Sequence, residues 1–284
     1  MAFLITGSSG FIGTNFCKFL IDRNIKFVAV DKIKNRYINI SKFYKVDLKN
    51  FKKLLEIVEK NNITKILHLA ALPGIKNCHD NPDQAFKDNI LVTYNIIKLL
   101  SCSKVKRILI ASSFAVDSFY RHPSIYSSTK KFCEDLAFSY FKNLQKQISI
   151  LKFSNVFGPY SLHKTSAIHS FIKNSIKNKS LLVHGNGMQT RDFIFVEDLI
   201  KKIFIIFNSK KLKFKYSIHT GKKISINRIL KFINEVSGKN NKKMYINTPG
   251  GYDIKQGKEL FNKIYLKKIL KCLKITFKWY KSSI

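Results

Sequence analysis

The sequence predicts an α/β protein built on a doubly wound parallel sheet. In the first half of the 284-residue chain, short apolar runs alternate with longer amphipathic segments. Strands that alternate with helices in this way indicate βαβ units, which produce parallel sheets. Apolar residues make up 45% of the sequence, which is enough for a substantial core in one large domain or two unequal ones.

The predicted elements follow one another in a regular order. Each predicted strand is a short apolar run, and each predicted helix is an amphipathic segment between two such runs. We expect the third strand to end in "KVDL", at Asp47. The predicted strands are 2–6, 26–30, the run ending at Asp47, 65–70, 107–112 and 148–153, and the predicted helices are 11–23, 50–60, 82–101 and 126–144.

The regular alternation stops after Asn155. Glycine and proline punctuate shorter elements from there on, and a Lys-rich stretch that contains Trp279 closes the chain. We therefore expect residues 1–155 to form the sheet domain and residues 156–284 to form mainly a smaller domain.

The formal net charge of +35 invites a nucleic-acid interpretation, because Lys and Arg neutralise phosphates. Of the 52 basic residues, however, only six are Arg, which is the usual residue for bidentate contacts with phosphates and bases. Lys, Ile and Asn are frequent along the whole chain, as AT-rich codon usage would produce. We therefore expect no specific nucleic-acid partner, although a basic surface still attracts anionic ligands.

The cysteines and the apolar runs indicate the compartment. Five widely spaced cysteines without a C-x-x-C pair suggest neither a disulfide framework nor a metal site, so we expect reduced thiols and no bound metal. The sequence shows no basic leader before its first apolar run and no apolar stretch near the roughly 20 residues of a membrane span. These features predict a cytoplasmic protein without a membrane partner.

A glycine-rich segment, "TGSSGFIG", follows the first predicted strand. Gly7, Gly10 and Gly13 would allow a tight turn and a close approach of backbone N–H groups to a pyrophosphate at the start of the next helix. Asp31 ends the second strand, 18 residues beyond Gly13, where a carboxylate binds the ribose 2′-hydroxyl and repels a 2′-phosphate. The pattern predicts a Rossmann-type domain that binds NAD rather than NADP, and Asp47 could similarly meet the adenine. A surface carboxylate at a strand end is the alternative for Asp31.

Tyr126 and Lys130 lie one helical turn apart in "SIYSSTKKFCED". Residues four apart share a helix face, so a phenol lies beside an ammonium. Taken alone, the pair is more typical of a solvated helix face in a chain rich in lysine.

Several segments together resemble the extended short-chain dehydrogenase/reductase family and its NAD-dependent nucleotide-sugar epimerases and dehydratases. The resemblance runs in order from Ala2 to about Leu266, and it implies that a segment near 190–220 returns to the Rossmann domain. The segments are "TGSSGFIG", "HLAALPG" (68–74), Tyr126 to Lys130, "NVFGP" (155–159) and "QTRDFIFVEDL" (189–199).

The resemblance implies that Tyr126 and Lys130 form the catalytic centre. A phenol is a poor base at neutral pH, and a neighbouring ammonium stabilises its phenolate. Tyr126 would take the proton of a sugar hydroxyl, while Lys130 would also hold the cofactor ribose. The third catalytic residue is a Ser or Thr, for which Ser113 is favoured and Ser112 stays as a structural alternative. Asn89 would order this centre, or be simply a satisfied helix asparagine.

The same resemblance implies the binding residues. Asn155 and Arg191 would contact the sugar diphosphate, for which a fork of guanidinium donors is well suited. The alternative for Arg191 is a surface pair with Asp192. The implied cofactor contacts are Gly7, Gly10, Phe11, Ile12, Gly13, Asp31, Asp47, Leu48, Leu69, Ala70, Ala71, Asn89 and Lys130.

The implied reaction is a nucleotide-sugar 4-epimerisation through a transient 4-keto intermediate. Dehydratases of the family carry a carboxylate just after the catalytic Ser or Thr, where this chain has Phe114 and Ala115. The segments most resemble the UDP-glucuronate 4-epimerase branch, so UDP-glucuronate or a related UDP-hexose is the expected substrate. A nucleotide-sugar ketoreductase and a non-catalytic NAD-binding protein of the same fold are the alternatives.

Two departures from the family pattern bear on substrate binding. Only 12 residues separate Ser113 from Tyr126, and Asp117-Ser118 replaces a customary Tyr-Gly. Near the C-terminus, "INTPGGYDI" lacks an arginine that relatives use on the diphosphate. By the same resemblance, the helices at 82–101 and 126–144 would form the interface of a homodimer.

Overall fold

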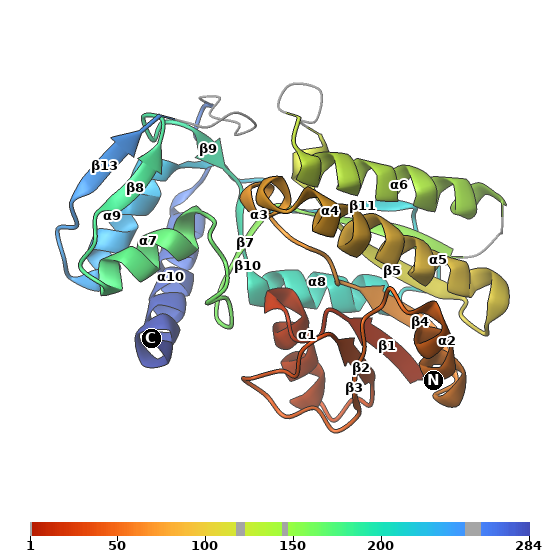
Figure 1. Cartoon of the computed structure of the whole chain (residues 1–284). Coiled ribbons are helices and arrows are strands. Elements are labelled where there is room, and N and C mark those ends of the chain that lie inside the picture. The colour runs from red at the N-terminus through yellow and green to blue at the C-terminus, as the bar shows by residue number, and fades with distance from the viewer. Residues whose placement is uncertain (1, 118–122, 144–146, 248–256) are drawn as a thin grey trace. The chain divides into compact units, whose positions relative to one another are not determined.

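The computed structural model describes residues 2–117, 123–143, 147–247 and 257–284, which form two compact units (Figure 1). The chain leaves the first unit after residue 153 and returns to it for one later segment. The first unit comprises Met1–Phe153 and Ile200–Ile218, and the second comprises Ser154–Leu199 and His219–Ile284.

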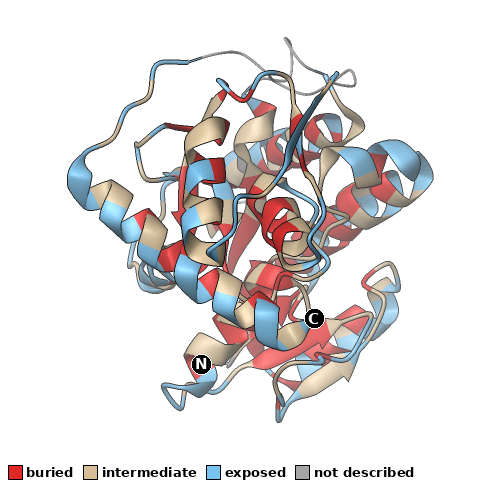
Figure 2. Cartoon of the chain, turned by 90° about the vertical axis from the view of Figure 1, so that its left-hand side faces the viewer, coloured by how far each residue is buried: buried red, intermediate tan, exposed pale blue. Residues whose placement is uncertain are grey.

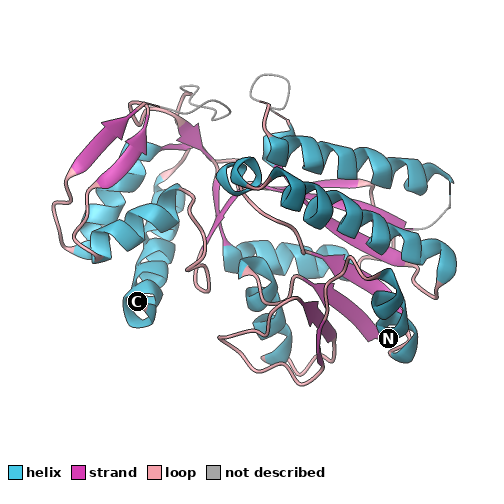
Figure 3. Cartoon of the chain, viewed as in Figure 1, coloured by secondary structure: helices cyan, strands magenta, loops and turns pink. Residues whose placement is uncertain are grey.

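A seven-stranded parallel sheet forms the centre of the first unit (Figures 1 and 3). Its order is β11-β6-β5-β4-β1-β2-β3, and every neighbouring pair is parallel. The strand order reverses between β1 and β4, so the predicted doubly wound fold is confirmed. The strands are β1 (Ala2–Thr6), β2 (Val28–Asp31), β3 (Phe43–Lys45), β4 (Ile63–His68), β5 (Arg107–Ser113), β6 (Gln147–Phe153) and β11 (Lys215–Ile218).

Helices cover both faces of this sheet. On one face Phe19 of α1 packs against Phe204 of α8, with ring centroids 5.2 Å apart. On the other face α2, α5 and α6 contribute Leu54, Ile96 and Ala137 to the main core. The helices are α1 (Phe11–Ile21), α2 (Phe51–Lys60), α3 (Ile75–Asp80), α4 (Pro82–Ala85), the π-helix η1 (Phe86–Leu91), α5 (Val92–Cys102), the 3₁₀ helix η2 (Phe114–Val116), α6 (Ile125–Asn143) and α8 (Val196–Asn208), whose first four residues belong to the second unit.

The core follows from the parallel register. Val28, Leu4, Ile66, Ile108 and Ile148 lie opposite one another on five adjacent strands, and each is at most 2% exposed. Strands that are buried on both faces read as nearly continuous apolar runs, which is why the alternation in the sequence was so clear. Much of the sheet is accordingly drawn in the colour of buried residues in Figure 2.

The predicted end of the third strand is wrong by two residues. β3 ends at Lys45, and the Val46 amide donates the last ladder hydrogen bond, to the carbonyl of Asp31. The side chain of Asp47 then accepts a hydrogen bond from the Lys49 amide over 3.0 Å. Such a local turn competes with strand pairing, so the chain turns away from the sheet at Asp47.

The helix predicted for 82–101 exists, but one part of it has a wider turn. α4 begins with Pro82 at its first position, and the backbone continues into η1 before α5 completes the segment. Short π-helices within α-helices occur frequently at functional sites. The amphipathic pattern predicts the segment as a whole, but it carries no information on this change of winding.

The second unit contains short paired strands and three further helices. β7 is parallel to β10, β9 is antiparallel to β12, and β8 is parallel to β13. No helix within the described residues is both long enough and apolar enough to traverse a bilayer. The elements are β7 (Asn155–Phe157), α7 (Ala167–Ile176), β8 (Leu181–His184), β9 (Thr190–Arg191), β10 (Phe193–Phe195), β12 (Ile224–Ser225), α9 (Ile226–Ser237), β13 (Lys243–Ile246) and α10 (Lys263–Ser283).

Candidate active site

The loop between β1 and α1 can be built only with glycine at two positions. Gly7 has a φ of +66°, and a Cβ there would lie 2.6 Å from the amide nitrogen of Ala70. A Cβ on Gly13 would lie 2.0 Å from the carbonyl oxygen of Gly7. Gly10 is the N-cap of α1 and has no side chain, so no capping side chain occupies the first amides of the helix. This cradle fits a pyrophosphate, which binds backbone N–H groups at a helix N-terminus.

Asp31 lies against this glycine loop. One carboxylate oxygen accepts a hydrogen bond from the Ser9 amide over 2.9 Å, and the other accepts one from the Ile33 amide over 3.3 Å. Burial raises the pKa of Asp31, while these amides and Lys32 oppose the rise. The carboxylate is thus held at the end of β2 beside the loop, as a ribose-binding acid requires.

Asn35, which follows β2 and contacts the glycine loop, was not predicted from the sequence. Its buried amide donates to the carbonyl of Ser8 over 3.1 Å and to the hydroxyl of Thr14 over 2.8 Å. Its oxygen accepts hydrogen bonds from two following amides. The segment after β2 is therefore tied to the glycine loop. An isolated Asn in a polar stretch offers no spacing pattern that would reveal this role.

Asp47 belongs to an ion-pair cluster beside the edge of the sheet. Lys49 lies 3.2 Å from its carboxylate, and Lys32 lies 3.8 Å from it. Lys32 also contacts Asp88 of η1 at 2.6 Å. The neighbouring Leu48 is buried, with 3% of its surface exposed. Asp47 therefore contacts two lysines and shares one of them, Lys32, with Asp88. The motifs did not indicate Lys32.

The segment after β4 lies next to the glycine loop. The amides of Leu69 and Ala70 donate to the carbonyl and hydroxyl oxygens of Thr6, over 3.2 and 3.4 Å respectively. His68 is buried between the hydroxyls of Thr6 and Thr93, at 2.7 and 3.2 Å. Burial lowers the pKa of His68 to about 3, and Lys130 adds to the fall, so the imidazole is neutral. This histidine orders the site rather than exchanging protons.

Tyr126 and Lys130 lie on a face of α6 that is turned toward the sheet. The hydroxyl of Tyr126 forms a hydrogen bond with Ser113, at the end of β5. Lys130 is only 6% exposed, and its ammonium donates to the carbonyl oxygen of Ala111 over 3.1 Å. Burial raises the pKa of Tyr126 to about 12, the bond with Ser113 opposes the rise, and Cys78 adds to it. The structure thus brings Ser113, Tyr126 and Lys130 together.

The two serines at the end of β5 point to different partners. Ser113 accepts a hydrogen bond from the Ala115 amide over 3.1 Å and caps η2. Ser112 donates to the carboxylate of Glu134 over 2.6 Å and is buried. Ser112 is engaged by Glu134, two turns along α6 from Tyr126, whereas Ser113 is the serine that interacts with the phenol. The geometry favours Ser113 as the partner of the phenol.

Asn89 connects two parts of the candidate site. Its side chain is fully buried in η1 and both donates to and accepts from the backbone of Leu72, over 3.2 and 2.7 Å. The same amide donates to the hydroxyl of Thr129 over 3.0 Å. Asn89 therefore fixes the segment after β4 to the helix that carries Tyr126, which matches the ordering role considered from the sequence.

Asn155 and Arg191 both lie in the second unit. The amide of Asn155 donates to the carbonyl of Asp192 over 3.1 Å, and the guanidinium of Arg191 donates to the carbonyl of Thr190 over 2.8 Å. Asp192 accepts hydrogen bonds from Ser154 and from the backbone and hydroxyl of Thr220. The two predicted sugar-diphosphate residues thus lie on β7 and β9, and both adjoin Asp192: Arg191 precedes it in the chain, and Asn155 donates to its carbonyl.

The two departures from the family pattern fall partly beyond the described residues. The loop residues 118–122 and most of "INTPGGYDI", residues 248–254, lie outside them. Asp117 is described, and it forms an ion pair with Lys152, a side chain only 3% exposed on β6. The residue that replaces a customary Tyr therefore has a charged partner of its own.

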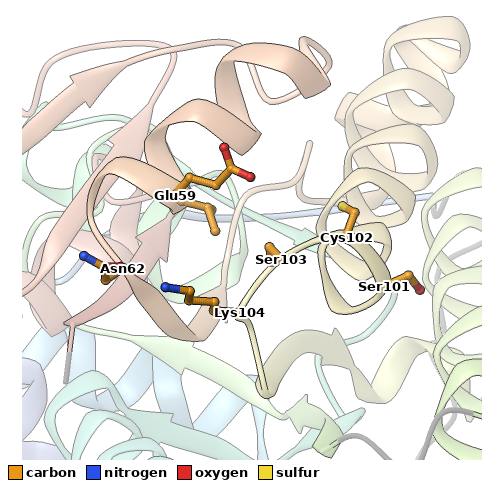
Figure 4. Close-up of a pocket in the computed structure, with 7 residues that line it drawn as sticks. Glu59, Asn62, Ser101, Cys102, Ser103 and Lys104 are labelled. Carbon is orange, nitrogen blue, oxygen red and sulfur yellow. The ribbon is translucent and has the colours of Figure 1, made fainter.

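A pocket of about 660 Å³ lies elsewhere on the first unit (Figure 4). It lies between the ends of α2 and α5, which precede the starts of β4 and β5, so it is at the opposite sheet edge from the glycine loop. Ligands of open α/β sheets bind at the carboxyl ends of the strands. The pocket is lined by Val58, Glu59, Asn62, Ser101, Cys102, Ser103 and Lys104, and none of these belongs to a motif.

Comparison with known proteins adds independent findings. The sequence model of the NAD dependent epimerase/dehydratase family matches residues 3–218. The chain is 29% identical to UDP-glucuronate 4-epimerase of Thermodesulfobacterium geofontis, over 99% of this chain and 97% of that protein.

Two solved structures share the fold over the full length of the chain. UDP-N-acetylglucosamine 4-epimerase from Methanobrevibacter ruminantium M1, solved with UDP-N-acetylmuramic acid, superposes with a TM-score of 0.87 and 23% identity, covering 100% of this chain and 99% of that one. UDP-glucuronic acid 4-epimerase from Bacillus cereus, solved with UDP-glucuronic acid and NAD, superposes with a TM-score of 0.83 and 24% identity. The match covers 100% of both chains. At these identities the likeness establishes the fold.

Proposed function

The chain belongs to the NAD-dependent epimerase/dehydratase family, as its motifs predicted, and from this premise we propose that it is a nucleotide-sugar 4-epimerase acting on UDP-glucuronate or a related UDP-hexose. One observation carries the proposal. The hydroxyl of Tyr126 is hydrogen-bonded with Ser113, one helical turn from the buried ammonium of Lys130, at the carboxyl edge of the sheet. Full-length similarity to a UDP-glucuronate 4-epimerase supports the choice of substrate.

NAD is the cofactor that this site fits. The glycine loop would hold the pyrophosphate at the start of α1, and Asp31 would accept hydrogen bonds from the adenosine ribose. Leu48, Ala70 and Lys130 lie among the further contacts proposed from the sequence. The bound cofactor would supply a reversible hydride acceptor for carbon 4 of the sugar.

The chain's own residues move the proton of the sugar hydroxyl. Tyr126 takes the 4-hydroxyl proton at its phenolic oxygen and gives it back at the end of the cycle. With a pKa of about 12 in this site, nearly all of Tyr126 is protonated at neutral pH, so the ammonium of Lys130 is needed to stabilise the phenolate. Ser113 donates a hydrogen bond to the reacting sugar oxygen and keeps it in line with Tyr126.

Two apolar side chains favour epimerisation over elimination of water. Phe114 and Ala115 occupy the positions that directly follow Ser113, and neither carries an acid or a base. A dehydratase needs further acid–base groups there. An epimerase needs only the proton transfer at Tyr126 and a substrate that can present its other face.

The substrate diphosphate would be bound by the second unit. Arg191 on β9 offers a fork of donors that suits a diphosphate, and Asn155 on β7 offers an amide. The second arginine of relatives is missing, so we expect weaker binding of the diphosphate than in those relatives.

We also propose that the protein works as a homodimer in the cytoplasm. Large apolar side chains are exposed along the predicted interface: Phe86 (57%), Leu91 (37%) and Tyr94 (39%) on η1 and α5, and Phe132 (49%) on α6. A patch of exposed apolar side chains is typical of a surface that another protein chain covers. All five cysteines are free thiols, which suits a reducing compartment.

A proton NMR time course tests the function. Purified protein is incubated with catalytic NAD and UDP-glucuronate, with UDP-glucose and UDP-N-acetylglucosamine in parallel, and the anomeric signals are followed. Conversion to the 4-epimer without net formation of NADH is the expected result. Stoichiometric consumption of reduced cofactor would instead identify a ketoreductase, and unchanged sugars despite bound NAD would reject catalysis of these substrates.

A further inference from the structure

Three successive turns of α6 contact three consecutive residues of β5. Tyr126 forms a hydrogen bond with Ser113, and Lys130 donates to the carbonyl of Ala111 over 3.1 Å. Glu134, one turn further on, accepts a hydrogen bond from Ser112 over 2.6 Å. The spacing of four residues keeps all three side chains on one helix face. Glu134 therefore continues the row formed by the proposed catalytic pair.

The carboxylate of Glu134 is buried and held on both sides. The residue is 4% exposed, one oxygen accepts the hydroxyl of Ser112, and the other lies 2.6 Å from the ammonium of Lys215 on β11. A buried carboxylate without partners would be very costly. Here each carboxylate oxygen has a partner, and the hydrogen bond with Ser112 fixes the side chain against the end of β5.

Glu134 is the charged member of the titratable groups around Lys130. These groups are Cys133 and Glu134 on α6, Cys78 on α3 and His68 on β4. Burial raises the pKa of both thiols, so they are neutral at pH 7. His68 is neutral as well, because burial lowers its pKa to about 3. Burial also lowers the pKa of Lys130 itself. The negative charge of Glu134 opposes that fall.

We propose that Glu134 is a positioning residue of the active centre, whose fixed carboxylate continues the row of Tyr126 and Lys130 along α6 and holds the end of β5 against this helix. This inference rests on the proposed function only in placing Tyr126 and Lys130 at the reacting atoms. The charge relationship between Glu134 and Lys130 exists whether or not a given sugar is turned over.

The test is a titration of Lys130 by NMR in protein labelled with ¹³C-lysine. The Lys130 signal is the one that disappears in Lys130→Met. In Glu134→Gln, which retains an acceptor for Ser112, we expect the pKa of Lys130 to fall by about one pH unit. Asp135→Asn is the matched control, because it removes the same charge from the next residue, which is exposed and ion-paired with Lys131. The control should leave the titration of Lys130 unchanged.

A second variant separates the electrostatic role from a merely structural one. Ser112→Ala removes the hydrogen bond to Glu134 but keeps its ion pair with Lys215, so the pKa of Lys130 should stay as in the wild type. Identical titration of Lys130 in the wild type and Glu134→Gln, or an equal fall in Glu134→Gln and Ser112→Ala, would overturn the proposal. None of these readouts needs turnover, so they remain decisive if the proposed reaction fails.

Discussion

The side-chain amide of Asn89 donates a hydrogen bond to the hydroxyl of Thr129 over 3.0 Å, and this contact joins the π-helix η1 to α6. Asn89 also exchanges two hydrogen bonds with the backbone of Leu72, in the segment that follows β4. Three pieces of the candidate site therefore meet at one fully buried amide. Its removal should affect both the stability of the first unit and the geometry of the catalytic centre.

We predict that Asn89→Ala lowers the free energy of unfolding by about 2 kcal/mol, because the fully buried side chain loses its hydrogen bonds with Leu72 and Thr129. The value is measured by urea denaturation. Asn81→Ala is the matched control, since Asn81 is exposed and donates one hydrogen bond to the carbonyl of Asn77. Equal losses in both variants would show that the Asn89 network contributes nothing beyond an ordinary surface hydrogen bond.

The proposed base gives the second prediction. Tyr126→Phe removes one oxygen, and we expect kcat for epimerisation to fall by about 10³-fold, within the usual contribution of general acid–base catalysis. NAD binding, measured by calorimetry, should change little. Tyr245→Phe on β13 makes the same chemical change at an exposed site and should retain full activity. A Tyr126→Phe protein with wild-type kcat would exclude this phenol as the base.

The sequence predicted those parts of the site that depend on local geometry. Gly7 and Gly13 could be recognised because a turn without space for a Cβ admits no other residue, and the spacing from Tyr126 to Lys130 follows from the helical period. Ser112 and Ser113 could not be separated by pattern, because both lie at the end of one strand. Only the packing of α6 on β5 shows which of them faces Glu134 and which faces Tyr126.

Residues whose role depends on distant partners were missed for a related reason. Asn35 and Lys32 act through contacts with the glycine loop and with η1, which lie 21 to 56 positions away in the sequence. No periodicity links such pairs. The winding of η1 was likewise invisible, because the apolar spacing of the whole segment still fits a helix.

The proposed dimer gives the third prediction. Leu91→Glu places a charge among exposed apolar side chains of η1 and α5, so we expect the protein to sediment as a monomer in analytical ultracentrifugation. Ile264→Glu on α10 is the control, because Ile264 is 77% exposed outside that surface. If the wild type itself sediments as a monomer at high micromolar concentration, this interface is wrong.

Asp31 gives the fourth prediction, which concerns stability and binding together. Burial raises the pKa of this carboxyl above its ordinary value, so the fold disfavours the charged form. A raised carboxyl pKa lowers stability at pH values above the ordinary one, because the unfolded chain then binds fewer protons than the folded protein. Asp31→Asn loses one of the two amide hydrogen bonds at every pH, because asparagine has a single accepting oxygen. Relative to the wild type, its free energy of unfolding should nevertheless be higher at pH 7 than below the ordinary carboxyl pKa of about 3.9.

The same substitution should weaken NAD binding at pH 7 by about tenfold, because the ribose hydroxyls lose a charged acceptor. Discrimination against NADP should fall at the same time, since the repulsion of a 2′-phosphate is removed. Denaturation at pH 7 and pH 3, together with calorimetry of both cofactors, gives the four values needed. Asp22→Asn is the control, because Asp22 is exposed beyond the end of α1 and pairs with Lys18. A stability difference that is the same at pH 7 and pH 3 would contradict the raised pKa, and an unchanged preference for NAD would show that Asp31 serves the fold rather than the cofactor.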